Sequence, residues 1–442
     1  MATSEIPDER APESSSAPGN ALYRLPRVVR RPLAFVLQHL PFPDAKLLAI
    51  VASPEVRAEP WAVYRRLRET HPVYRSRLGA WVVASHAGVD AVLRHQSVSV
   101  DESKSAQHGQ NPAPDEFMRL MDQTMLFRDP PDHDRLRRLV ARAFTPRRIE
   151  ALRPRVEALT RQHLDRLASR GEMDLLADFA YPLTVDVICE LLGVPLEGRA
   201  AFPPWARALA ARVDVQAVRT PDIERRGSVA ATEISECLDG LVTDPRQRVP
   251  GGLIDALVAA EEEGDRLTHD EVISTCALLL IAGHETTANL IGNGVVTLLA
   301  NPDQLRELEA GNIPMASAVE ELLRHDGPVQ FTQRVALADL DVGGNTIAAG
   351  EVIALLVAAA NRDPAVFDDP DGLDLSRSPN PHLAFGFGTH ACLGAALARL
   401  EASVVLTELI DRWPDLRLAG RPKWRDTYVL RGLRSLPIAW AA

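Results

Sequence analysis

The ten residues FGFGTHACLG, 385–394, contain one of only four cysteines in a chain of 442 residues. Cys392 stands in a glycine-rich loop directly before a predicted helix, where the helix N-terminus and the loop N–H groups favour negative charge. A thiol in such a place is well suited to ionise. From the residues alone, a small buried cysteine is the commoner alternative. A hydrolase-type nucleophile is a second alternative, although its flanking signatures are absent.

The residues around this cysteine suit a flat ligand. Gly386, Gly388 and Gly394 let the backbone turn tightly and approach such a ligand closely, because glycine lacks a Cβ atom. Phe385 could stack on the ligand, and His390 could donate a hydrogen bond to an acidic group on it.

The run AGHETT places an acid and an alcohol in the middle of a long apolar stretch. Ala282 and Gly283 leave room for a neighbouring group, and burial of the Glu285 carboxylate is costly unless it has a partner or a task. The alternative is that Glu285 faces solvent and that Thr286 only hydrogen-bonds to its own helix. The residues alone leave both interpretations open.

Charged residues at helical spacing form two further candidate pairs. Glu321 and Arg324 are three residues apart in EELLR and can form an ion pair on one helix face. His133 and Arg137 are four residues apart in DHDRLR and would share one face of another helix. Taken alone, each pair is better explained as part of a charged helix surface.

A long helix must position the AGHETT run. Thr268 and Glu271 form a predicted capping box at its start, and Asn301 followed by proline ends it. About 33 residues at 1.5 Å each span roughly 50 Å, far more than most helices of globular proteins. We therefore expect this helix to cross the molecule, with its middle buried.

Other elements follow from helical spacing, alternation and turn residues. A polar run from Ser99 to Asp122 predicts a long loop. Helices are predicted at 59–71, 86–95, 315–325 and 393–412, and strand-like runs at 80–85, 334–337, 339–350 and 351–360. The expected fold is mainly α with small antiparallel β-sheets, an α+β class, and its strands are concentrated in the second half of the chain.

Composition excludes several classes of protein. A net charge of −11 and a pI of about 5.6 argue against a nucleic-acid partner. The cysteines lie far apart in sequence, so neither a zinc pattern nor a redox pair appears, and a reducing cytoplasm fits. We expect a cytoplasmic protein with no membrane span, built as a disordered tail over residues 1–30 and a single domain over residues 31–442.

The cysteine loop resembles the haem-thiolate signature of the cytochrome P450 family at all six fixed positions: Phe385, Gly386, Gly388, His390, Cys392 and Gly394. The resemblance extends over about residues 55–440. It implies the P450 fold, with the long central helix over a haem b group, and it implies that Cys392 is the axial thiolate ligand of the haem iron.

The resemblance also implies roles for the other motifs. In the groove that Ala282 and Gly283 would form over the haem, Thr286 would organise water beside bound O2, and Glu285 would help to relay protons. Glu321 and Arg324 look like the family's ExxR pair, which fixes the loop around the thiolate. The family's usual arginine partner of that pair is replaced here by other residue types, and Arg377 is the candidate for its role.

The two haem propionates require cationic or hydrogen-bonding partners. His133 and Arg137 match the family's H-x-x-x-R pattern. Arg334, in the strand-like TQRVAL, and His390 complete the set that the resemblance implies.

The implied activity is that of a bacterial haem-thiolate monooxygenase, which inserts one oxygen atom from O2 into a lipophilic small molecule, as in hydroxylation of a secondary metabolite. Epoxidation, desaturation or C–C coupling on the same scaffold, and a non-catalytic haem sensor or binding protein, remain as alternatives. We expect a separate ferredoxin and ferredoxin reductase to donate electrons through a basic patch on the cysteine side. Candidate residues for this patch are Arg137, Arg138, Arg142, Arg147 and Arg148.

Overall fold

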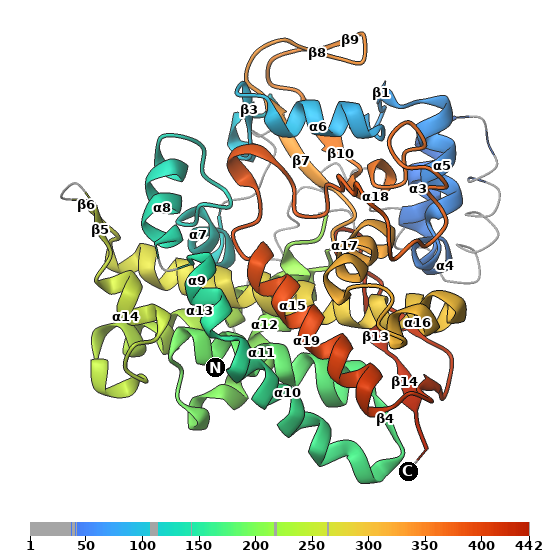
Figure 1. The fold of residues 1–442 in the computed structure, drawn as a ribbon. Coiled ribbons are helices and arrows are strands. Elements are labelled where there is room, and N and C mark those ends of the chain that lie inside the picture. Colours follow the sequence, from blue (N-terminus) through green and yellow to red (C-terminus); the bar gives the residue numbers. More distant parts are fainter. Residues whose placement is uncertain are drawn as a thin grey trace, which may run out of the picture.

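The computed structural model describes residues 37, 40, 42–106, 114–142, 144–215, 219–262 and 265–441. The predicted disordered tail, residues 1–30, lies outside these residues. Helices dominate the described part and the strands form small sheets at its edges (Figure 1). Within the same residues, no helix is long and apolar enough to cross a membrane.

Helix α15 (His269–Ala300) carries the AGHETT run and crosses the molecule, as predicted (Figure 1). The predicted capping box is present: Thr268 Oγ1 accepts the Glu271 N–H at 3.2 Å, and the Glu271 carboxylate accepts the Thr268 N–H at 2.8 Å. The helix is 32 residues long and buried on most sides, which is typical of a central core helix. Its neighbours include α11 (Tyr181–Leu192), α12 (Phe202–Arg212), α13 (Pro221–Thr243), α17 (Met315–Asp326) and α19 (Ala395–Arg412).

The remaining helices surround this core, and those predicted at 59–71 and 86–95 are confirmed as α5 and α6. They are α3 (Pro43–Ala52), α4 (Pro54–Ala58), α5 (Trp61–Thr70), α6 (His86–Arg94), α7 (Glu116–Asp122), α8 (Asp132–Ala141), α9 (Pro146–Ala151), α10 (Arg153–Leu167), α14 (Leu253–Val258), α16 (Pro302–Glu309) and α18 (Val357–Ala360).

The prediction of one long loop from Ser99 to Asp122 is wrong for its last part, which forms α7. The Asp115 side chain caps this helix by accepting the Met118 N–H at 3.0 Å. The short run EFMRLMD buries Phe117, Leu120 and Met121, so tertiary packing stabilises a helix that the polar composition of the whole stretch concealed.

The main sheet combines strands from both halves of the chain. Its order is β1 (Val73–Arg75), β2 (Ala80–Val83), β10 (Val352–Leu355), β7 (Thr332–Ala336) and β3 (Val98–Ser99). All its pairs are antiparallel except β2 with β10, which is parallel. The prediction of purely antiparallel pairing is therefore wrong for this sheet. Strands are nevertheless concentrated in the second half of the chain, as predicted, since ten of the fourteen strands in the described part begin at Glu261 or later.

Smaller strand pairs complete the fold. The predicted hairpin at 339–350 is present as β8 (Leu340–Val342) and β9 (Asn345–Ile347). The strand predicted over 351–360 ends at Leu355, and its alanine-rich second half forms α18, in keeping with the helix propensity of alanine. The other strands are β4 (Glu172–Asp174), β5 (Glu261–Glu262), β6 (Asp265–Arg266), β11 (Arg417–Leu418), β12 (Lys423–Trp424), β13 (Leu433–Ser435) and β14 (Pro437–Ala439).

Candidate active site

The loop that carries Cys392 turns twice through left-handed backbone. Gly386 has a φ of +64° and Gly388 a φ of +70°, values that residues with a Cβ atom rarely adopt. A Cβ atom at Gly388 would also lie 2.5 Å from the Leu93 carbonyl oxygen. The Cys392 N–H donates to the Phe385 carbonyl at 2.9 Å and closes the loop just before α19 begins.

The Cys392 side chain is exposed, whereas Cys189 and Cys276 are buried. The alternative of a small buried core cysteine is therefore wrong for Cys392. Although the residue is exposed, the protein atoms around its thiol desolvate it, and this raises the pKa of Cys392 above its ordinary value. The N–H groups of Gly394 and Ala395, together with nearby arginines, act in the opposite direction. Coordination to a metal ion would deprotonate such a thiol outright.

Two histidines from distant parts of the chain meet beside this loop. The ring centroids of His133, on α8, and His390 lie 4.2 Å apart. His133 Nδ1 hydrogen-bonds to Asp134 at 2.9 Å, while its buried Nε2 has no hydrogen-bond partner among the residues that the structure describes. Burial, then His133 and Arg334, lower the pKa of His390 to about 3. His390 is therefore neutral at pH 7 and still has one N–H to donate.

Two arginines accompany these histidines. Arg334, on β7, is buried and donates to the Thr332 hydroxyl at 3.2 Å and to the Gln333 carbonyl at 2.7 Å. Arg137, on α8, is half-buried, and its charge acts on both His390 and Cys392. Neither arginine forms an ion pair with any residue that the structure describes. This group of donors is thus suited to a ligand that brings its own carboxylates.

The middle of α15 presents a small exposed patch. Ala282 is exposed and Thr286 is half-buried, and the Thr286 hydroxyl donates to the Ala282 carbonyl at 2.5 Å. The missing Cβ atom of Gly283 would lie 3.3 Å from Ile188 Cδ1, so Gly283 allows close packing of α15 against α11. Of these two small residues, Ala282 is the one that leaves open space.

The Glu285 side chain is 1% exposed, so the interpretation that it faces solvent is wrong. Its Oε1 accepts from Arg425 at 2.5 Å, from the Asn289 amide at 3.2 Å and from the Tyr181 hydroxyl at 3.4 Å. Its Oε2 is buried and has no hydrogen-bond partner in the described structure. The carboxylate is therefore satisfied on one oxygen only.

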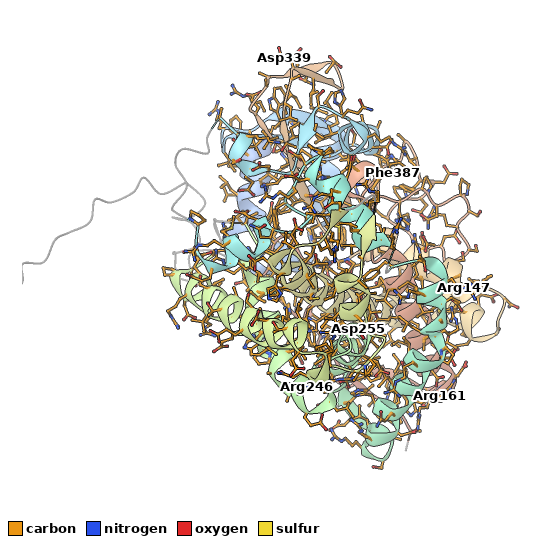
Figure 2. All side chains as sticks on the ribbon, turned by 90° about the vertical axis from the view of Figure 1, so that its left-hand side faces the viewer. Arg147, Arg161, Arg246, Asp255, Asp339 and Phe387 are labelled. Atoms are coloured by element: carbon orange, nitrogen blue, oxygen red, sulfur yellow. The ribbon has the colours of Figure 1, made fainter. Side chains whose placement is uncertain are left out.

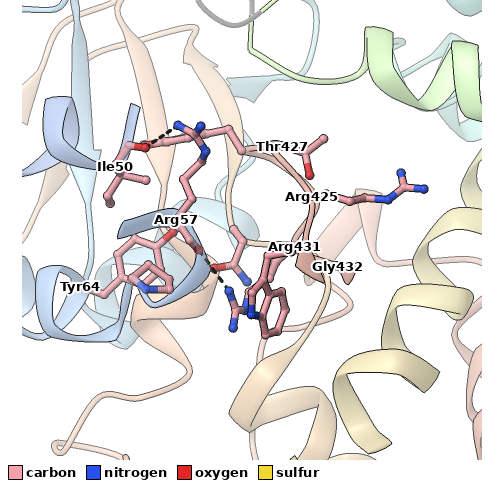
Figure 3. Close-up of a pocket in the computed structure, with 11 residues that line it drawn as sticks. Ile50, Arg57, Tyr64, Arg425, Thr427, Arg431 and Gly432 are labelled. Carbon is pink, nitrogen blue, oxygen red and sulfur yellow. Dashed lines mark hydrogen bonds between the residues drawn. The ribbon is translucent and has the colours of Figure 1, made fainter. Parts of the chain in front are cut away.

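Arg425 comes from the connection between β12 and β13, and its side chain points away from Arg57 and Tyr64 (Figure 3). The segment lies very close to α15, because a Cβ atom at Gly432 would be 2.0 Å from Asn289 Oδ1. Sequence reasoning missed Arg425, since no motif links it to AGHETT. A cavity of about 40 Å³, enough for one or two water molecules, adjoins it. Its lining consists of Ala210, Ala211, Asp214, Glu285, Arg425, Thr427, Val429 and Leu430.

Glu321 and Arg324 form a fully buried pair on α17. Arg324 Nε and Nη2 each donate to the Glu321 carboxylate at 2.7 Å. Arg377 Nε lies 3.1 and 3.3 Å from the two oxygens, so Arg377 is the third partner. The Asp374 N–H and the Asn380 amide donate to the same carboxylate at 2.9 and 3.1 Å. Both oxygens of Glu321 are thus satisfied by two cations and two neutral donors.

Arg324 extends this cluster to the segment that precedes the cysteine loop. It donates to the carbonyls of Asn361, Pro370 and Gly372 at 3.0, 2.8 and 2.9 Å. Arg324 therefore fixes backbone that has no regular secondary structure of its own.

The chain resembles known proteins along most of its length. A profile of the family described as Cytochrome P450 matches residues 216–414. The monooxygenase PikC of Streptomyces venezuelae is 40% identical over 394 residues, 87% of this chain and 91% of that one. The polyketide biosynthesis cytochrome P450 PksS of Bacillus subtilis is 38% identical over 401 residues, 87% and 96% of the two chains. P450BioI, solved in complex with acyl carrier protein ligated to hexadec-9Z-enoic acid, superposes with a TM-score of 0.82 at 38% identity, covering 88% and 100%.

The chain therefore belongs to the cytochrome P450 family. It is a monooxygenase, an oxidoreductase that uses haem iron and O2, and bacterial members of the family generally use redox partners and lipophilic substrates. The residues present fit a haem group. Cys392 offers an exposed sulfur. His133 Nε2, Arg137 and Arg334, for which the described part of the chain supplies no acidic partner, offer donors for the propionates.

Proposed function

We propose that Cys392 ligates the haem iron and that four donors bind the haem propionates. These donors are His133, Arg137, Arg334 and His390. The observation that carries this proposal is their convergence beside the cysteine loop. Among the described residues, neither arginine has an ion-pair partner and the buried His133 Nε2 has no hydrogen-bond partner. Buried donors of this kind are costly unless a ligand satisfies them. Phe385, Gly386 and Gly394 would contact the ring, and a Cβ atom at Gly394 would meet no protein atom within 4 Å.

Bound haem supplies the activation of O2 and the transfer of one oxygen atom into a substrate C–H bond. The protein delivers protons and positions water beside the haem. Glu285 lines the adjoining cavity, and its Oε2 accepts no hydrogen bond among the described residues, so we infer that protons are taken up on this oxygen. The Thr286 hydroxyl donates to Ala282 at rest, which leaves its oxygen free to accept a hydrogen bond from water on the exposed patch of α15.

We propose that the substrate is a lipophilic secondary metabolite and that the reaction is a hydroxylation. Ala210, Ala211, Val429 and Leu430 contribute apolar side chains to the lining beside Glu285, together with the polar or charged Asp214, Arg425 and Thr427. A similar protein, PksS, is named for polyketide biosynthesis, and P450BioI holds a long-chain acyl group. These relatives support an apolar substrate of microbial metabolism.

A binding screen with turnover tests this substrate and reaction. Ligands would be ranked by the shift of the Soret band and then incubated with NADPH and a surrogate ferredoxin and reductase. Hydroxylation predicts a product that gains one oxygen atom, whose position is then determined by product structure to separate it from epoxidation. Loss of two hydrogens or formation of a coupled product would instead support the alternative chemistries. Ligand binding without any product from the whole library would favour a haem sensor.

We propose an acidic ferredoxin, reduced by its reductase, as the electron donor. We define the basic surface as Arg138, Arg142, Arg147 and Arg148, all of which are exposed. Arg147 and Phe387 lie in the same right-hand part of Figure 2. Phe387, from the cysteine loop, is 41% exposed, and the Arg94 guanidinium lies 3.3 Å from its ring centroid. A positive surface with an exposed aromatic ring suits an acidic partner. A reducing cytoplasm fits the four free cysteines.

A further inference from the structure

A second ionic cluster lies next to the Glu321 pair, and none of the roles above accounts for it. Arg399, on α19, donates through Nε and Nη2 to the Glu320 carboxylate on α17 at 2.6 and 2.9 Å. His382 Nε2 lies 3.0 Å from Glu320 Oε2. The Glu320 carboxylate of α17 therefore joins three segments that meet at the cysteine loop. The other two are α19 and the residues that precede the loop.

Arg399 is also in contact with the cysteine loop itself. Its guanidinium carbon lies 4.5 Å from the centroid of the Phe385 ring. Phe385 in turn accepts the Cys392 N–H through its carbonyl at 2.9 Å. Arg399 is thus a cation stacked on the residue that anchors the cysteine backbone, and the charges of Arg399 and Cys392 act on each other.

The cluster holds this cation in one place. A bidentate arginine–carboxylate pair fixes both distance and orientation, and the contact with an aromatic ring adds a third constraint. Burial alone would raise the pKa of Glu320, but His382 and Arg399 outweigh it and lower that pKa to about 2. Glu320 is therefore ionised near neutral pH and holds Arg399 as a carboxylate.

Folding alone does not require this arrangement. Glu321, the next residue, already ties α17 to the segment before the loop through two arginines and two neutral donors. The side chain of Arg399 is 41% exposed, and a partly exposed ion pair contributes little to stability. A fixed positive charge beside a metal ligand does affect the reduction potential of the metal strongly.

We propose that Arg399, held by Glu320 and His382, is a positioning residue that fixes a positive charge beside the Cys392 sulfur and thereby raises the reduction potential of the bound iron. This inference rests on the proposed function, because it requires Cys392 to ligate haem. Reduction adds one negative charge to the iron–thiolate unit, and a fixed cation stabilises the reduced form. Arg399 thus makes the iron easier for an external donor to reduce.

Spectroelectrochemical titration of the haem-loaded protein tests the inference without measuring turnover. We expect Arg399→Leu to lower the equilibrium constant for reduction about tenfold, which is about 59 mV for a one-electron couple. Arg399→Lys keeps the charge and should stay within about twofold of the wild type. Low ionic strength is needed, because salt screens a partly exposed charge.

The matched control is Arg161→Leu, at an arginine of α10 that is labelled in Figure 2. Arg161 pairs with Glu408 of α19 at 2.7 Å, so this variant also breaks an arginine–glutamate pair that involves α19. This variant should leave the potential unchanged. Equal potentials for Arg399→Leu and the wild type, or equal shifts in Arg399→Leu and Arg161→Leu, would overturn the inference.

A second variant decides the matter if Arg399→Leu does not take up haem. Glu320→Gln keeps the cation and removes the carboxylate charge that partly cancels it, so we expect a potential above that of the wild type, and a potential at or below the wild-type value would contradict the inference. Failure of the proposed function looks different. In that case the wild-type ferrous–CO complex itself would lack the red-shifted band of a thiolate-ligated haem.

Discussion

Two buried glutamates, Glu321 and Glu285, stand in opposite surroundings. Glu321 is fully buried, and both its oxygens accept hydrogen bonds, two of them from the fully buried Arg324. Glu285 is 1% exposed, yet within the described part of the chain only its Oε1 has hydrogen-bond partners. A carboxylate with every lone pair satisfied has nothing left to exchange and acts as a structural centre. A carboxylate with one oxygen free beside a cavity retains a place to bind and release a proton.

The cations that pair with Glu321 and with Glu285 also differ in their exposure to solvent. The cations around Glu321 hold the backbone that leads to Cys392, and Arg324 has no exposed surface. The cation on Glu285, Arg425, is 20% exposed and adjoins a cavity that can hold water. The cysteine side of the site is therefore held by satisfied ion pairs, and we propose that the α15 side exchanges protons with water.

The largest expected effect on stability comes from Glu321→Ala. It leaves two buried arginines without their carboxylate, and breaking such a buried cluster costs about 3–5 kcal/mol of the free energy of unfolding. Urea unfolding of the purified protein measures this loss. Glu408→Ala, which breaks the exposed pair with Arg161, is the matched control and should cost less than about 1 kcal/mol. Similar losses in the two variants would show that the Glu321 cluster is not a structural centre.

Glu285→Gln should cost little stability but much activity. Arg425 can turn toward water, so we expect a loss of only about 1–2 kcal/mol in unfolding free energy. Turnover should fall about 100-fold, and the solvent deuterium isotope effect on turnover should increase, because proton supply becomes limiting. Turnover close to that of the wild type, with an unchanged isotope effect, would remove Glu285 from the proton path.

Charge reversal on the basic surface should change electron entry alone. In Arg147→Glu combined with Arg148→Glu, we expect about tenfold slower turnover with ferredoxin and reductase, because steering toward an acidic partner is lost. Turnover driven by hydrogen peroxide needs no partner and should survive. If both rates fell equally, the substitutions would have damaged the site and the docking surface would lie elsewhere.

The smallest expected effect is the acid sensitivity of the Glu320 cluster. The pKa of Glu320 is about 2 in the folded protein, below its ordinary value of 4.5. The unfolded chain therefore binds more protons than the folded one, and stability falls as the pH drops from about 5 toward 3. Glu320→Gln should flatten this part of the curve of unfolding free energy against pH. A curve that keeps the wild-type slope would assign the acid sensitivity to other carboxylates.

The sequence predicted those parts of the site that lie within short motifs. The capping box, the length of α15 and the contact between Glu321 and Arg324 all depend on residues a few positions apart, where helix geometry fixes the distance. The i, i+4 spacing likewise places His133 and Arg137 on one helix, although their meeting with His390 needed the whole fold.

Contacts between distant segments were beyond sequence reasoning. Arg425 reaches Glu285 across 140 positions only because Gly432 lets the C-terminal segment lie against Asn289. The same limit applies to the parallel pair of β2 with β10, which joins the two halves of the chain. Helix α7 was missed for a related reason, since packing of three apolar side chains stabilises it within a polar stretch.

Substitution of the proposed iron ligand tests the central claim most directly. The wild type, Cys392→Ala and the matched control Cys237→Ala would be expressed with ample porphyrin supply, and their iron content and ferrous–CO spectra compared. We predict that the wild type and Cys237→Ala give the red-shifted band of thiolate-ligated haem and that Cys392→Ala loses it, with less bound iron. Unchanged iron content and an unchanged band in Cys392→Ala would contradict the account.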